Sequence, residues 1–224
     1  MSQVNILAEK LKTIYYPVSC PELPLQPQKD FRTEFQISTK AKVLAVVGRI
    51  RQVKGQRIVL QSLSQLLLEF TDLVLLMPYR DTSENEAEMQ ALRSDISRLE
   101  LEAHVRLIPE REDILALMEF ADAGIVSSVD SEVICRVAVE FFSVGTPVVA
   151  FPTGCLPEII RHAENGLLTK DQTEKALTDE LRKILTDSEL CERLGQGARR
   201  DAEIRFNPQK MLTETLEVFE RYLN

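Results

Sequence analysis

Residues 127–160, SSVDSEVICRVAVEFFSVGTPVVAFPTGCLPEII, are the stretch that decides the fold of this chain. The pattern predicts the end of a buried strand, a helix over about 133–144, a second buried strand and a loop into another helix. The expected helix is apolar on nearly every face, and such a helix is buried inside a protein. It nevertheless carries Glu140, and Glu132 stands at its start. Buried carboxylates are rare unless they are paired, so these two acids need a partner or a function.

Apolar runs and helical spacing alternate along the sequence on either side of this stretch. The expected strands are 43–47, 73–77, 105–108, 123–126, a fifth within the stretch 127–160 and one that begins near Gly166. The expected helices between the first four are 56–69, 84–100 and 113–120. Parallel strands require crossover connections of this kind. The alternation therefore predicts an α/β fold, with a Rossmann-like parallel sheet of about six strands and helices on both faces.

Two further segments flank the expected sheet domain. The N-terminal segment shows a short predicted strand at 11–18, followed by prolines that are typical of an extended linker. The C-terminal segment shows only helical spacing, and its last helix begins at Pro208. The C-terminal helices are expected at 173–186, 189–200 and 208–222. We divide the chain into a linker with a remnant strand at 1–39, a Rossmann-like domain at 40–170 and C-terminal helices that pack on it at 171–224.

The composition excludes several classes of function. The formal net charge of −8 argues against nucleic acid, or an anionic membrane surface, as the main partner. No apolar run is long enough to cross a bilayer, and the first residues lack the layout of a signal peptide. The chain has only two histidines and four scattered cysteines, which gives a zinc site or a histidine triad little to build on. We expect a cytoplasmic protein with reduced thiols.

Several motifs in this stretch resemble those of one protein family. Glu132 is followed by Glu140 after seven residues, and then by Gly145-Thr146-Pro147 and Leu156-Pro157-Glu158. This pattern is similar to the E-x7-E region of retaining glycosyltransferases with the GT-B fold, in particular family 4 or group 1. The resemblance implies that the chain is the C-terminal, donor-binding half of a two-domain enzyme. The N-terminal acceptor domain, with a catalytically important histidine, would then be missing from the chain.

The resemblance assigns roles to residues of the expected cleft. It implies that Glu140 binds the donor ribose and that Glu132 binds the donor sugar. Arg49 and Lys54, after the first strand, would hold the donor diphosphate and stabilise the leaving group. Fixed cations suit that task in an enzyme that uses no metal. No DxD motif of metal-dependent enzymes is present, so we expect neither a metal nor a cofactor.

Other residues complete the expected donor site. Val137 is expected to bind the donor, Arg136 would lie near the ribose, and backbone groups between Ile108 and Arg111 would contact the base. Gly154 could face the donor sugar or could simply be a loop glycine. A departure from the family pattern lies after the first glutamate, where 133–135 carry Val, Ile and Cys in place of glycines. Glycines let a backbone approach a ligand closely, so the sugar contact has less support than the ribose contact.

Each assignment has a structural alternative. Arg49 and Lys54 could be solvated charges on a surface loop. Glu140 could pair with Arg136, one turn earlier on the same helix. Glu132 could do no more than interact with the dipole of the helix that it precedes.

The expected function is transfer of a sugar from a UDP-, GDP- or ADP-sugar to an acceptor hydroxyl, with retention of the anomeric configuration. Cell-envelope polysaccharide or lipopolysaccharide synthesis is the expected pathway, and the full-length protein could contact the inner face of the membrane. The chain alone is expected to bind the donor weakly and to transfer nothing. One alternative is a non-catalytic nucleotide-binding or docking module with the same fold. Another is a UDP-sugar epimerase, which would need acidic and histidine groups that the sequence does not show.

Overall fold

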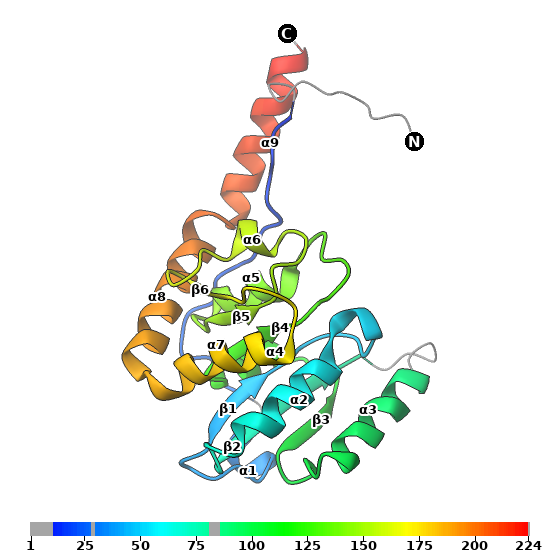
Figure 1. Cartoon of the computed structure of the whole chain (residues 1–224). Coiled ribbons are helices and arrows are strands. Elements are labelled where there is room, and N and C mark those ends of the chain that lie inside the picture. The colour runs from blue at the N-terminus through cyan, green and yellow to red at the C-terminus, as the bar shows by residue number, and fades with distance from the viewer. Residues whose placement is uncertain (1–10, 28–29, 81–85, 224) are drawn as a thin grey trace, which may run out of the picture.

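A single parallel sheet forms the centre of the protein (Figure 1). The computed structural model describes residues 11–27, 30–80 and 86–223. The six strands of the sheet pair in the order β3-β2-β1-β4-β5-β6, and every neighbouring pair is parallel. The strands are β1 (Lys42–Ala45), β2 (Leu73–Tyr79), β3 (Val105–Pro109), β4 (Ala123–Val126), β5 (Val148–Ala150) and β6 (Gly166–Leu168). The predicted Rossmann-like α/β fold is confirmed.

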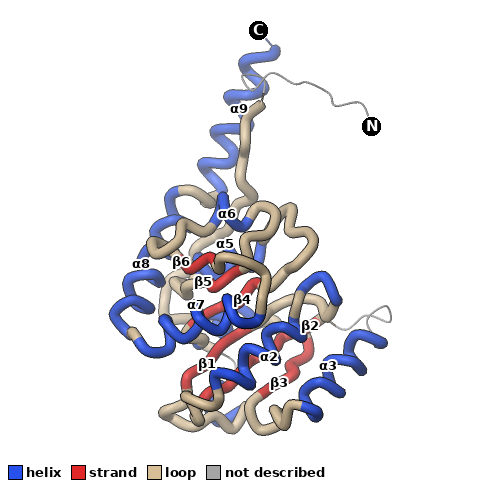
Figure 2. The backbone as a smooth tube through the Cα atoms, viewed as in Figure 1, coloured by secondary structure: helices blue, strands red, loops and turns tan. Residues whose placement is uncertain are grey.

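Helices cover both faces of the sheet, as the sequence predicted. Helices α2 (Gln56–Leu66), α3 (Glu86–Arg98) and α7 (Glu174–Thr186) lie in front of the strands in Figure 2. Helices α1 (Phe31–Glu34), α4 (Ile114–Phe120) and α5 (Arg136–Ser143) cover the other face, and α8 (Ser188–Ile204) closes the edge beyond β6. The first two residues of the expected helix 84–100 lie outside the described residues.

Alternate side chains of each strand enter two separate hydrophobic cores. Leu44 and Leu75 pack with α2, whereas Val43 and Val74 pack on the face covered by α5. Both sets are buried, which is why the strands are continuous apolar runs and show no alternation with polar residues.

The order of the strands reverses at β1. Strands β2 and β3 add to one side of β1, and β4, β5 and β6 add to the other. In a doubly wound sheet, ligands bind in the crevice at the carboxyl ends of the strands where this reversal occurs. Here that crevice lies between the ends of β1 and β4.

The central helix is shorter than the sequence predicted. The expected helix covers 133–144, but α5 begins at Arg136. Its second half is buried as expected, whereas Val133 and Ile134 are 78% and 61% exposed. The backbone before α5 is bonded to another loop and not to a helical turn, because the carbonyl of Glu132 accepts a hydrogen bond from the N–H of Cys155 at 2.8 Å. Apolar content could not distinguish a buried helical turn from an exposed apolar loop.

The short strand expected at 11–18 is not formed, so this prediction is wrong. The segment runs beside helix α9, where Nζ of Lys12 lies 2.7 Å from Oε2 of Glu217 (Figure 1). Farther along, the ring of Tyr15 meets that of Phe206 edge-on, with 5.4 Å between centroids. A strand needs a second strand as its hydrogen-bonding partner. This segment packs against helices instead.

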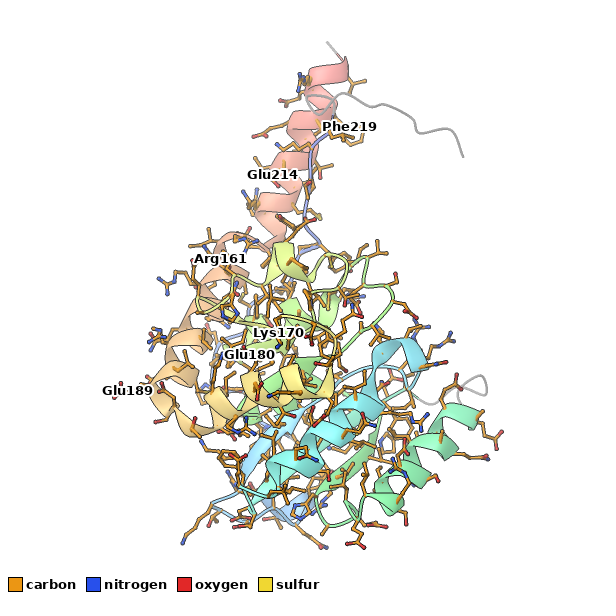
Figure 3. The ribbon with its side chains drawn as sticks, in the orientation of Figure 1. Arg161, Lys170, Glu180, Glu189, Glu214 and Phe219 are labelled. Atoms are coloured by element: carbon orange, nitrogen blue, oxygen red, sulfur yellow. The ribbon has the colours of Figure 1, made fainter. Side chains whose placement is uncertain are left out.

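Helix α9 (Pro208–Leu223) projects away from the body of the protein (Figure 1). Figure 3 labels Phe219 on the projecting part, where its side chain is 58% exposed. Leu212, Leu216 and Leu223 on the same helix are also exposed. Apolar side chains of this helix are therefore uncovered over much of its length. The division of the chain at residues 39 and 170 stays a prediction. Helix α6 (Leu156–Ile159) and the 3-10 turn η2 (Gln52–Lys54) complete the described elements.

Candidate functional site

A hollow of about 490 Å³ lies at the crevice between β1 and β4. Its walls are the loops that follow these two strands and the first turns of α5. The charged residues that line it are Arg49, Lys54, Arg80, Glu132, Arg136 and Glu140. Cations outnumber carboxylates here, although the whole chain carries a formal net charge of −8. A concave surface with this local excess of positive charge attracts anions.

The loop after β1 is held against the loop after β4. Gly55 has a φ of +66°, and a Cβ at this position would collide with the carbonyl oxygen of Ser127. Only glycine adopts this backbone conformation at so close an approach without strain. Nε2 of Gln56 donates to the carbonyl of Arg49 at 2.8 Å, which ties the middle of the loop to the start of α2. These contacts place Arg49 and Lys54 on the wall of the hollow.

Lys54 and Glu132 form an ion pair across the crevice. Nζ of Lys54 donates to Oε2 of Glu132 at 2.6 Å. The side chain of Glu132 is only 8% exposed, and that of Lys54 is 31% exposed. The hydroxyl of Ser128 donates to the same carboxylate oxygen. The buried carboxylate that the sequence left unexplained is therefore paired and hydrogen-bonded, as burial of a charge requires.

Glu140 lies half-buried on α5, facing the same hollow. Burial raises the pKa of this carboxyl group, and the positive charge of Arg136 partly opposes the rise. Nη2 of Arg136 lies 3.6 Å from Oε1 of Glu140. The ion pair considered as an alternative is thus present, but a single long contact leaves much of the acceptor capacity of the carboxylate for a ligand.

The hollow brings together all but one of the expected donor-binding residues. Val137 lines it with the charged residues. Ile108 is buried and lines a different hollow, with Phe35 and Arg106. Arg111, at the end of the segment expected to contact the base, lies over the ring of Phe31 at 4.9 Å and pairs with α1. A base contact from Ile108 stays a prediction.

Two residues of the site were not selected from the sequence. Arg80 follows β2, lines the hollow and pairs with Glu110 at 3.3 Å. Ser128 follows β4 and binds Glu132. A lone arginine or serine after a strand is common. The one available signal was position, because polar residues at the carboxyl ends of adjacent parallel strands meet at one edge of a sheet.

The described residues offer little for metal or thiol chemistry. No group of three or more His, Cys, Asp or Glu side chains among them could hold a metal ion. Cys135 lines the hollow, but burial raises the pKa of its thiol to about 12. Lack of a metal requirement stays a prediction.

Over residues 11–27, 30–80 and 86–223, no helix is both long enough and apolar enough to cross a membrane.

Comparison with known proteins shows that the chain matches one family model and is similar to three proteins described here. The model of the family described as "Glycosyl transferases group 1" matches residues 27–201. Spore coat protein SA of Bacillus subtilis (strain 168) is 29% identical over an aligned length of 223 residues, and the match covers 95% of this chain and 59% of that protein. A glycosyltransferase of Rickettsia africae has a similar structure, with a TM-score of 0.80 at 20% identity over 86% of this chain and 51% of that chain.

A third relative was solved with ligands. Anabaena Alr3699/HepE, in complex with UDP and glucose, has a TM-score of 0.78 at 25% identity, covering 84% of this chain and 50% of that chain. The chain thus spans about half the length of these two solved relatives. The shared fold is the Rossmann-like half of a GT-B glycosyltransferase. Because the family model covers most of the sequence, the chain belongs to the group 1 glycosyl transferases.

Proposed function

We propose that this chain is the donor-binding half of a retaining glycosyltransferase, which moves a sugar from a nucleotide-sugar to an acceptor hydroxyl. The observation that carries the proposal is the single hollow at the strand reversal that gathers Arg49, Lys54, Glu132 and Glu140. The complex of the Anabaena relative with UDP and glucose supports a nucleotide-sugar as the ligand.

In this proposal the donor diphosphate lies against Arg49 and Lys54. Cleavage of the sugar–phosphate bond increases the negative charge on the departing nucleoside diphosphate. Cations already in place stabilise that charge without a proton transfer. The positive end of the dipole of α5, which also borders the hollow, favours an anion in the same place.

The two carboxylates then serve the two ends of the donor. Glu140 accepts hydrogen bonds from the ribose diol, and its partial burial strengthens such bonds. Glu132, in the loop that precedes α5, accepts hydrogen bonds from hydroxyl groups of the sugar. These roles are the ones that the family resemblance implied.

The acceptor and the transfer step require residues that we place outside this chain. The relatives from Rickettsia africae and Anabaena are about twice as long. The exposed apolar side chains of α9, together with Leu11, offer a surface on which such a second domain could pack. We propose that the chain alone binds the donor weakly and transfers nothing. Its role in cell-envelope synthesis and its cytoplasmic location stay predictions.

Isothermal titration calorimetry of the chain with UDP-glucose, GDP-mannose and ADP-glucose tests the proposal. We expect at least one of them to bind, and the double variant Arg49→Ala/Lys54→Ala to lose that binding while keeping its circular dichroism spectrum. Absence of binding by all three at millimolar concentration would overturn the assignment. Sugar transfer by the isolated chain would overturn the statement that a second domain is required.

A further inference from the structure

We propose that Glu132 makes the cleft prefer an intact nucleotide-sugar to the free nucleoside diphosphate, because it competes with the diphosphate for Lys54. The inference rests on the proposed function and deepens it. It concerns which form of the ligand, donor or spent product, the same site retains.

The first observation is that Lys54, one of the cations of the cleft, already forms an ion pair. Nζ of Lys54 lies 2.6 Å from Oε2 of Glu132. A diphosphate that recruits Lys54 must share it with this carboxylate or take it away. In either case a second negative charge stands beside the diphosphate. Repulsion between the two is stronger in a partly buried crevice than in water, since the effective dielectric constant is lower there.

The second observation is that Glu132 is held in place from several sides. The hydroxyl of Ser128 donates to its carboxylate, and the N–H of Cys155 donates to its backbone carbonyl at 2.8 Å. Gly154 packs so closely on its backbone that a Cβ would not fit. The carboxylate therefore cannot easily turn away from an incoming anion.

Ser128 is itself held in place by hydrogen bonds from Thr153 and, through it, Gln172. The hydroxyl of Thr153 donates to the carbonyl of Ser128 at 2.6 Å. Nε2 of Gln172, in the loop after β6, donates in turn to that hydroxyl at 2.8 Å. Lys54, by contrast, is 31% exposed and carries a long flexible side chain. The ion pair therefore opens by movement of Lys54, and Glu132 stays where it is.

The consequence differs between the two ligands. A nucleotide-sugar brings hydroxyl groups that can donate to Glu132 and replace Lys54 as its partner. A nucleoside diphosphate brings no such hydroxyls. It draws Lys54 away and leaves a buried carboxylate short of a partner next to its own charge, which is unfavourable. Glu132 thus weakens binding of the product more than it weakens binding of the donor.

The test compares UDP with UDP-glucose by calorimetry, on wild type and on Glu132→Gln. If UDP ligands do not bind, the GDP/GDP-mannose or ADP/ADP-glucose pair is used instead. The amide keeps the shape and hydrogen-bonding capacity but removes the charge. We expect Glu132→Gln to bind the diphosphate at least threefold more tightly. We also expect the ratio of the two dissociation constants, diphosphate over donor, to fall at least fivefold.

Glu158→Gln is the matched control. It removes the same charge from an exposed carboxylate of α6 that does not line the hollow. Both affinities should stay within twofold of wild type. Ser128→Ala, which frees the carboxylate to turn away, should shift the ratio in the same direction as Glu132→Gln. It also replaces that variant if Glu132→Gln fails to fold.

The outcomes separate this inference from the proposed function. Equal weakening of both ligands in Glu132→Gln, or no change in the ratio, would overturn the competition for Lys54 while leaving donor binding intact. Where Ser128→Ala replaces Glu132→Gln, the same two outcomes would overturn the competition for Lys54. If wild type binds none of the three pairs, the proposed function fails, and this inference fails with it.

Discussion

Arg136 and Glu140 stand one turn apart on α5, with Nη2 of the arginine 3.6 Å from Oε1 of the glutamate. The cation precedes the anion, which is the weaker orientation for a helical pair. The side chain of Arg136 is 59% exposed, so solvent screens the interaction. Burial of Glu140 acts against its charge at the same time. The pair is therefore a weak source of stability, and the carboxylate is available to a ligand.

Glu140→Gln should therefore separate binding from folding. We expect the free energy of unfolding to change by less than about 0.5 kcal/mol, because an i,i+4 helical ion pair is worth only about 0.3–0.5 kcal/mol. Affinity for the nucleoside diphosphate should fall about tenfold, because a charged hydrogen bond is worth roughly 1.5–3 kcal/mol and a neutral amide less. Urea unfolding and calorimetry measure the two quantities. A variant that unfolds more easily yet binds normally would show that pairing with Arg136 is the role of Glu140.

The raised pKa of Glu140 predicts a dependence on pH. Burial favours the neutral carboxyl in the folded protein, so its contribution to stability is fully present below the unfolded pKa. That contribution is lost as pH rises through the folded pKa. Binding has the opposite sign, because only the carboxylate accepts both ribose hydroxyls. As pH is lowered from 7.5, nucleotide affinity should start to fall at a pH higher than about 4.3, the ordinary pKa of a glutamate side chain.

Glu140→Gln provides the reference for this experiment. The phosphate groups of the ligand titrate equally with both proteins, so the difference between the two affinity profiles reports Glu140. We expect the wild-type affinity to approach that of the variant at low pH. Parallel profiles from pH 7.5 to 5 would contradict the assignment.

Arg49→Ala should weaken binding of the nucleoside diphosphate at least about tenfold, the effect of losing a charged hydrogen bond. It should also reduce the dependence of affinity on salt, since one cation fewer meets the phosphates. The carbonyl that accepts from Gln56 is retained, so the loop should keep its shape. Arg93→Ala, an exposed arginine on α3 outside the hollow, should leave both quantities unchanged. A similar loss in both variants would point to net charge and not to a specific contact.

Gly154→Ala should damage the sugar end of the site. Gly154 has a φ of +56°, and a Cβ there would collide with the backbone of Glu132. We expect a loss of stability of at least about 1 kcal/mol and weaker binding of UDP-glucose. Gly145→Ala is the matched control, since Gly145 has a φ of +75° but nothing within 3.9 Å of its Cβ position. It should show strain without the loss of affinity. Equal affinities in the two variants would mean that Gly154 is only a loop glycine.

Asp201→Ala should destabilise the protein without involving the cleft. This buried carboxylate of α8 accepts hydrogen bonds from Nη2 of Arg161 at 2.5 Å, Nη1 of Arg205 at 2.7 Å and Nδ2 of Asn165 at 2.7 Å. Arg161 is labelled in Figure 3. Removing one partner of a buried ion pair typically costs about 3–5 kcal/mol. Glu203→Ala, which breaks an exposed pair on the same helix, should cost less than about 1 kcal/mol. Urea unfolding measures both, and equal costs would contradict the central role of Asp201.

Local pattern predicted most of the elements but not all of their ends. The strand at 123–126 was placed to the residue, because a short apolar run between polar turns has few other solutions. The start of α5 was misplaced because Val133 and Ile134 are apolar yet exposed. The strand expected at 11–18 failed because a strand depends on a partner that local sequence does not describe.

The sequence by itself determined the alternation of strands and helices along the chain, and with it a parallel sheet, whereas the reversal at β1 that creates the crevice is seen only in the folded sheet. The sequence also identified Arg49, Lys54, Glu132 and Glu140 as residues for that crevice. Only the tertiary structure decided that Lys54 and Glu132, 78 residues apart, neutralise each other. It also brought in Arg80 and Ser128, and it left Ile108 in another hollow. The physical reason is that periodicity is a local property, whereas pairing of charges depends on which strand ends the folded sheet places side by side.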